Sequence, residues 1–158
     1  MPSAAPHSRR QPATVLLVED NRDDVVLIQR AFHKAQIVAP LQVVTDGERA
    51  MAYLEGSGPY ADRTRHPLPV FVLLDWRLPR RDGGEVLAWV RSRPDLRELP
   101  VVVLTSSQEP ADIRAAYGNG ANSYLLKPVD FQNLLELVQG LGLYWLVLNV
   151  PPELTQQS

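Results

Sequence analysis

The sequence contains no cysteine and carries little net charge. Without cysteine it has no disulfide, no thiolate nucleophile and no cysteine-ligated zinc or iron–sulfur site. A net charge of −2 provides no basic surface to attract nucleic acid. No apolar run is long enough to cross a membrane, although the last predicted helix comes nearest. We therefore expect a cytoplasmic protein that binds neither nucleic acid nor membrane, since a cysteine-free chain suits a reducing compartment.

The 158 residues fit one domain of ordinary composition, with 45% hydrophobic and 22% charged residues. Residues 1–13 are rich in Pro, Ser and Arg and have no apolar core, so we predict a flexible N-terminal extension rather than a signal peptide. Residues 14–150 form the predicted domain and end in an extended apolar helix. Residues 151–158 form a polar tail. The long loop 56–68 is predicted to be flexible or to contact a partner.

Five apolar runs alternate with segments of helical periodicity. The third run, 70–74, is apolar enough for a strand buried on both faces. Asn21, Asp82 and Asp130 each precede a helical segment and are placed to cap it. The alternation predicts an α/β fold, in which a parallel sheet is covered by helices on both faces and joined by right-handed crossovers.

Polar side chains follow four of the predicted strands. Glu19 and Asp20 follow the first, Asp75 the third, Thr105 the fourth and Lys127 the fifth. Parallel strands end at one edge of the sheet, where open α/β sheets bind ligands, so we expect these side chains to meet. Three neighbouring carboxylates favour a hard cation, above all Mg²⁺. A lysine and a hydroxyl beside it suit a phosphoryl group, and a carboxylate is then the natural nucleophile, forming an acyl phosphate.

This pattern resembles the receiver domain of two-component response regulators. The resemblance covers about residues 13–140 and keeps the family's order and spacing. It is carried by Leu17-Val18-Glu19-Asp20-Asn21, Leu73-Leu74-Asp75-Trp76-Arg77-Leu78-Pro79 with Asp82-Gly83, Thr105-Ser106, and Tyr124 with Leu126-Lys127-Pro128. It implies a flavodoxin-like (CheY-like) fold with a doubly wound five-stranded parallel sheet of order 2-1-3-4-5.

The same resemblance implies the phosphoryl chemistry. Asp75 would accept a phosphoryl group from a sensor histidine kinase. Mg²⁺ would be held by Glu19, Asp20, Asp75 and the backbone carbonyl of Arg77. The protein would be a signalling switch rather than an enzyme, with at most slow self-dephosphorylation.

Four further residues acquire roles through the resemblance. Thr105 and Lys127 would contact the phosphoryl oxygens, and Tyr124 would turn inward behind Thr105. The peptide bond before Pro128 would be cis, a geometry tolerated mainly at proline. Tyr124 also has a simpler interpretation as a packed aromatic residue.

The end of the chain narrows the resemblance. The sequence stops soon after Pro152, so we expect no output domain. The 56–68 loop and the apolar end resemble stand-alone regulators associated with bacterial and cyanobacterial phytochromes, which implies a phytochrome kinase as donor. A helix that is apolar on all sides needs a cover, either a second copy of the chain or its own tail. The predicted homodimer interface comprises Leu143, Tyr144, Trp145, Val147 and Leu148.

Two other functions remain alternatives. The first is a receiver-shaped interaction module that works without phosphorylation. The second is a Mg²⁺-dependent phosphatase with an aspartate nucleophile, but Arg77 stands where such an enzyme has its general acid–base. Arg77 and Ser107 are expected to flank the phosphoryl group and to set its lifetime by controlling water access. The histidines, including His66, have no metal-binding spacing and are interpreted as surface residues.

Overall fold

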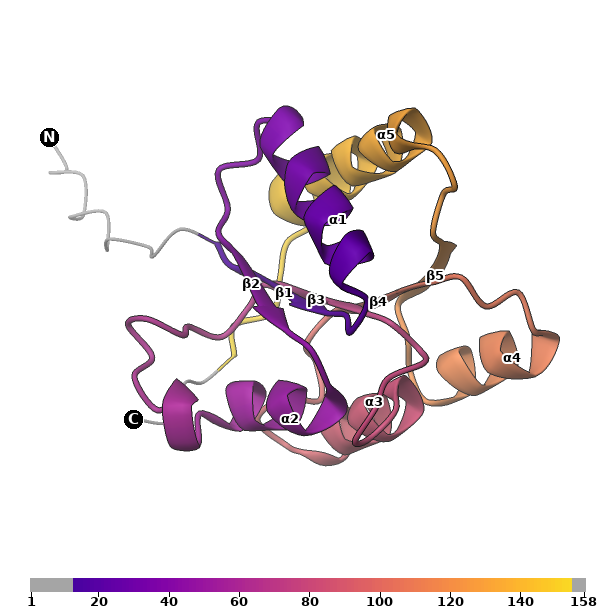
Figure 1. The fold of residues 1–158 in the computed structure, drawn as a ribbon. Helices are drawn as coiled ribbons and strands as arrows, with labels where there is room; N and C mark the ends of the chain where they lie inside the picture. The colour runs from indigo at the N-terminus through magenta and orange to yellow at the C-terminus, as the bar shows by residue number, and fades with distance from the viewer. Residues whose placement is uncertain (1–12, 155–158) are drawn as a thin grey trace, which may run out of the picture.

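Five parallel strands form one sheet in the computed structural model, which describes residues 13–154 (Figure 1). The strands are β1 (Val15–Val18), β2 (Leu41–Val44), β3 (Phe71–Leu74), β4 (Val101–Thr105) and β5 (Ser123–Leu126). Their order is β2-β1-β3-β4-β5, which confirms the predicted doubly wound flavodoxin-like sheet. The predicted N-terminal extension lies outside the described residues, apart from Ala13.

Helices cover both faces of the sheet (Figure 1). On one face lie α1 (Arg22–Lys34) and α5 (Phe131–Leu141), which contact each other. On the other lie α2 (Gly47–Glu55), α3 (Gly83–Ser92) and α4 (Pro110–Gly118). A short 3₁₀ helix, η1 (Gly58–Tyr60), follows α2, and a π-helical segment, η2 (Gly142–Leu148), continues α5.

Side-chain caps fix where four helices begin. The side chains of Asn21, Asp46, Asp82 and Asp130 each accept a hydrogen bond from the backbone N–H three residues further on. Three of these caps are those expected from the sequence. Each such cap contributes about 1 kcal/mol to stability. Because all four caps follow a strand or the turn after it, they direct these helices away from one edge of the sheet.

The core consists of two apolar clusters, one on each face. Strand β3 supplies Val72 and Leu74 to one cluster and Phe71 and Leu73 to the other. All four side chains are buried, as the unbroken apolar run predicts for a strand covered on both faces.

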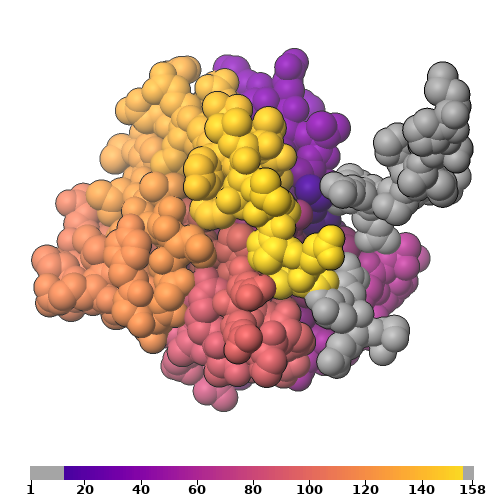
Figure 2. All heavy atoms as spheres, turned by 180° about the vertical axis from the view of Figure 1, so that it is seen from behind, coloured from indigo at the N-terminus to yellow at the C-terminus, as the bar shows by residue number. Residues whose placement is uncertain are grey.

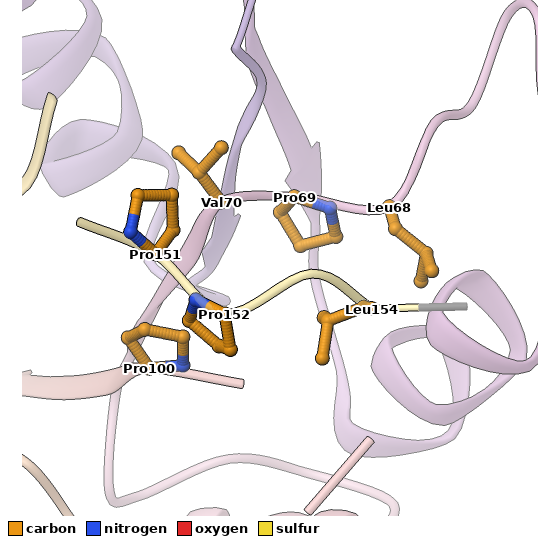
Figure 3. Close-up of a pocket in the computed structure, with 7 residues that line it drawn as sticks. All are labelled: Leu68, Pro69, Val70, Pro100, Pro151, Pro152 and Leu154. Carbon is orange, nitrogen blue, oxygen red and sulfur yellow. The ribbon is translucent and has the colours of Figure 1, made fainter. Parts of the chain in front are cut away.

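The segment after α5 folds back over the domain. Trp145 stacks on Phe71, with ring centroids 6.0 Å apart. The chain then runs over the surface on the side of the molecule that faces away in Figure 1 (Figure 2). There Pro151, Pro152 and Leu154 face residues 68–70 and Pro100 across a hollow of about 140 Å³ (Figure 3). Within residues 13–154, no helix is long and apolar enough to span a membrane.

The 56–68 loop is tied to the domain. The Arg63 guanidinium donates to two carbonyls at the end of α2 and to the carbonyl of His66. The Tyr53 hydroxyl donates to a loop carbonyl at 2.8 Å. The ring of His66 packs edge-on against Tyr53 and Tyr60. The interpretation of His66 as a plain surface residue was wrong, because the loop places its ring against Tyr53 and Tyr60.

Candidate functional site

Strand register brings the predicted acidic residues level with one another. Val18 of β1 pairs with Leu74 of β3, so Glu19 and Asp75 follow at the same height on adjacent strands. Oxygen atoms of Glu19, Asp20 and Asp75 all lie within 4.8 Å of one another. Glu19 and Asp75 are buried, whereas Asp20 is exposed. The structure therefore brings together the three carboxylates that the sequence predicts as a metal site.

Lys127 occupies the centre of this acidic group. Its Nζ lies 2.6 Å from Glu19, 2.9 Å from Asp75 and 3.0 Å from Asp24. Only 11% of the lysine side chain is exposed. Asp24 is a contact that sequence reasoning missed, because its place in the first turn of α1 already explains an acidic residue there.

Burial and neighbouring charges shift the pKa values of Glu19 and Lys127. Burial raises the pKa of Glu19 to about 7; the Lys127 hydrogen bond opposes this rise and the Asp75 charge adds to it. Burial lowers the pKa of Lys127, but the hydrogen bonds that its ammonium donates to Glu19 and Asp75 outweigh that effect and raise it. One ammonium thus contacts three carboxylates, with Asp20 beside two of them, and a divalent cation would relieve the excess of negative charge. The all-oxygen donor set fits a hard cation such as Mg²⁺.

The loop after β3 is seated by two glycines. A Cβ on Gly83 would lie 2.6 Å from the backbone oxygen of Asp75, and one on Gly47 would lie 1.9 Å from that of Arg81. Arg80 and Arg81 both have positive φ, at 54° and 101°, which L-residues rarely adopt. The loop that carries Arg77 is therefore held close to Asp75 in a strained conformation.

Thr105 and Tyr124 lie on the two neighbouring strands. Thr105 is buried, and its Oγ1 accepts from the Ser107 N–H at 3.4 Å. The hydroxyl of Tyr124, which is half-buried, donates to the Ser107 carbonyl at 2.8 Å. Burial raises the pKa of Tyr124. Ser107 therefore links the predicted switch hydroxyl to the predicted switch aromatic residue.

The expected cis bond before Pro128 was wrong for this structure. There are no cis peptide bonds among residues 13–154, so Lys127 and Pro128 are joined in trans. The trans form is intrinsically favoured by about 0.5–1 kcal/mol even before proline. With that bond in place, Lys127 still donates its N–H to the Thr105 carbonyl and reaches Asp75 with its side chain.

Comparison with known proteins identifies the family of this chain. Residues 15–139 match the response regulator receiver domain. The chain belongs to this family. It is a response regulator of two-component signalling, and its strand order is that of a receiver domain.

Known receivers resemble this one over nearly their whole length. The chain is 43% identical over 144 residues to the probable methanogenesis regulatory protein FilR2 of Methanothrix harundinacea, covering 89% of this chain and 88% of FilR2. It is 41% identical over 135 residues to the response regulator Rcp1 of Synechocystis, covering 85% and 90%. The phosphorylated cyanobacterial phytochrome response regulator RcpA superimposes with a TM-score of 0.83 at 38% identity, covering 90% of this receiver and 100% of RcpA.

A similar receiver has been solved with a divalent metal ion bound. The Mn²⁺-bound form of Rcp1 superimposes with a TM-score of 0.80 at 39% identity, covering 90% of this receiver and 100% of that chain. Receiver domains thus bind a divalent cation, and Glu19, Asp20 and Asp75 of this receiver provide a group of carboxylates that fits one.

Proposed function

We propose that Asp75 is the phosphoacceptor of this response regulator. The observation that supports this is the contact of a buried carboxylate at the end of β3 with Lys127 at 2.9 Å, beside two further acids. A carboxylate oxygen attacks phosphorus, and a P–O bond forms as the P–N bond to the donor imidazole breaks. The bonding electron pair leaves with that imidazole. Lys127 then neutralises charge on the phosphoryl oxygens.

Glu19, Asp20 and Asp75 hold Mg²⁺ in this proposal, together with the backbone carbonyl of Arg77. When bound, the ion neutralises the approaching phosphoryl oxygens and orients them for in-line attack. The protein contributes the fixed positions of its carboxylates, which the adjacent strand ends of β1 and β3 set. Gly83 packs closely against the backbone of Asp75 and Trp76, which fixes the start of the loop that carries Arg77.

Thr105 and Tyr124 carry the signal away from the site. The Thr105 hydroxyl moves toward the phosphoryl group and leaves the Ser107 N–H that it now accepts from. Ser107 also accepts the Tyr124 hydroxyl, so the movement changes the surface formed by α4, β5 and α5. Another protein reads that surface.

Phosphorylation by a small donor tests the acceptor. Acetyl phosphate or phosphoramidate with Mg²⁺ should label the wild type and leave Asp75→Asn unlabelled, because the amide is not a nucleophile. Asp95→Asn is the matched control, since Asp95 pairs with Arg93 before the opposite end of β4 and should be labelled fully. Equal labelling of wild type and Asp75→Asn would refute the assignment. EDTA should abolish labelling, which tests the metal.

A phytochrome-type histidine kinase is the proposed donor. One of the similar proteins supports this, because RcpA is described as a cyanobacterial phytochrome response regulator and is 38% identical to this chain. FilR2, at 43% identity, is described as a probable methanogenesis regulatory protein, so similar proteins differ in the pathway that they serve. Phosphotransfer profiling against a panel of histidine kinases should show fastest transfer from a phytochrome. Faster transfer from unrelated kinases would refute this donor.

We also propose a homodimer through the segment after α5. Leu143, Tyr144, Val147 and Leu148 are each more than half exposed in the single chain. Trp145 differs from the expected interface set, because it is half-buried against Phe71. A second copy would cover the exposed four, since residues 151–154 of the same chain lie elsewhere, against residues 68–70 and Pro100.

Light scattering after size exclusion tests this dimer. The wild type should elute as a dimer at micromolar concentration, and Val147→Asp should convert it to a monomer. Val129→Asp is the control, because Val129 is exposed and precedes the start of α5, at the opposite end of that helix from η2. A monomeric wild type would remove the proposal.

A further inference from the structure

Asp112, in the first turn of α4, holds groups from two different loops. Its Oδ2 accepts from the Arg77 guanidinium at 2.7 Å and from the Ser107 hydroxyl at 2.5 Å. Although 35 residues separate Arg77 from Asp112, both belong to the edge of the sheet that carries Asp75.

Each group that Asp112 holds also contacts a residue of the proposed phosphoryl site. The backbone N–H of Arg77 donates to the Asp75 carboxylate at 3.3 Å. The carbonyl of Ser107 accepts the Tyr124 hydroxyl at 2.8 Å. Asp112 is therefore the point at which the acceptor's loop and the loop behind Tyr124 are joined.

The charges of Arg77 and Asp112 allow Arg77 to exchange Asp112 for a phosphoryl group on Asp75. Hydrogen bonds from Ser107 and Arg77 lower the pKa of Asp112, so the carboxylate is charged at neutral pH. The Arg77 side chain is 68% exposed and can turn, whereas that of Asp112 is only 14% exposed. A phosphoryl group on Asp75 would place two negative charges two residues from Arg77. That group and Asp112 would then compete for one guanidinium.

We propose that Asp112 is a positioning residue that holds Arg77 and Ser107 in the unphosphorylated arrangement, and that phosphorylation transfers Arg77 to the phosphoryl group. This rests on the proposed role of Asp75 as acceptor. When Arg77 leaves, Asp112 is no longer held in place and so no longer fixes the Ser107 hydroxyl. The hydrogen bond between the Ser107 carbonyl and Tyr124 can then rearrange. Asp112 thus stabilises the unphosphorylated arrangement and couples phosphorylation of Asp75 to the surface at α4.

Removing the Asp112 charge should favour the phosphorylated arrangement. A partly exposed ion pair changes an equilibrium by roughly 0.2–1 kcal/mol, so Asp112→Asn should tighten binding of a phosphoryl mimic about 1.4- to five-fold. The effect must depend on Arg77. In an Arg77→Ala background, Asp112→Asn should raise the affinity by clearly less, because only the Ser107 contact is then left to remove.

Titration with beryllofluoride in saturating Mg²⁺, followed by tryptophan fluorescence, measures this affinity. Glu85→Gln is the matched control, because it also removes a helix first-turn acid paired with an arginine, Arg81, and should leave the affinity unchanged. Wild type must bind the mimic and Asp75→Asn must not. If wild type fails to bind, the proposed acceptor is wrong and the role of Asp112 falls with it.

Two results would overturn the role of Asp112 alone. One is wild-type affinity in Asp112→Asn, and the other is an equal gain with and without Arg77. Should Asp112→Asn fail to fold, the wild type still tests the proposal. The side-chain NMR signal of Arg77, assigned by its absence in Arg77→Ala, should shift when beryllofluoride is added, and an unmoved signal contradicts the exchange.

Discussion

Replacing Lys127 by alanine should destabilise the domain and make its stability depend on Mg²⁺. The substitution removes the one ammonium within 3.0 Å of Glu19, Asp75 and Asp24. Glu19 is 1% exposed and Asp75 is 6% exposed, so water cannot replace the lost charge at either. The variant therefore combines a broken buried ion pair with repulsion among the carboxylates that remain.

The size of this effect follows from two opposing contributions. Breaking a buried ion pair from one side costs about 3–5 kcal/mol. Glu19, whose pKa is already about 7, can take up a proton in the variant and so limits the cost. We therefore expect a loss of about 3 kcal/mol in the free energy of unfolding without metal, the lower end of that range.

Urea unfolding followed by circular dichroism measures the loss, with EDTA and then with Mg²⁺. At free Mg²⁺ of about ten times its dissociation constant, binding to the folded state adds about 1.4 kcal/mol. The gain should be larger in Lys127→Ala than in wild type, because the ion replaces a missing charge. Lys34→Ala is the control, since Lys34 lies over the Phe131 ring and is exposed.

A loss below about 1 kcal/mol in EDTA would refute the reasoning, since that is the scale of a surface ion pair. Equal Mg²⁺ gains in wild type and Lys127→Ala would separately show that the metal does not share the carboxylates with this lysine. A loss in Lys34→Ala as large as in Lys127→Ala would show that the effect is not specific to the site.

Two further perturbations test the surroundings of the site and the loop beside α2. Gly47→Ala should weaken Mg²⁺ binding measured by calorimetry, because its Cβ would overlap the Arg81 carbonyl at 1.9 Å and displace the loop after β3; unchanged affinity would contradict this. Burial raises the pKa of Tyr53 to about 12, so its contribution to stability is complete below pH 10 and is lost as the pH rises toward 12. Tyr53→Phe should therefore remove the highest tyrosinate step from an ultraviolet titration, and a persisting step would contradict the assignment.

Much of the fold and the core of the site could be predicted from the sequence. Apolar runs that stop at Glu19, Asp75 and Lys127 specify both the buried strands and the edge at which these side chains meet. The reason is physical, because parallel strands in register deliver the residues that follow them to one place. The predicted N-caps depend on contacts only three residues apart, so they too could be inferred locally.

The contacts of Asp24 and Asp112 could not be predicted in this way. Lys127 lies 103 residues from Asp24, and Arg77 lies 35 residues from Asp112, so only the packed fold brings them together. Local patterns favour a simpler role for both acids, which occupy the first turns of helices. The π-helical hydrogen bonding of 142–148 is likewise invisible to apolar periodicity, which does not distinguish one helical register from another.

The Lys127–Asp24 contact has a consequence for how the chain acquires its chemistry. Contacts between residues so far apart form late, because a long loop must close before they stabilise the chain. A nascent or truncated chain that lacks β5 would contain Asp75 but not its lysine. The ability to retain a phosphoryl group would then mark completion of folding, so labelling could serve as a quality test that distinguishes the finished domain from its compact precursors.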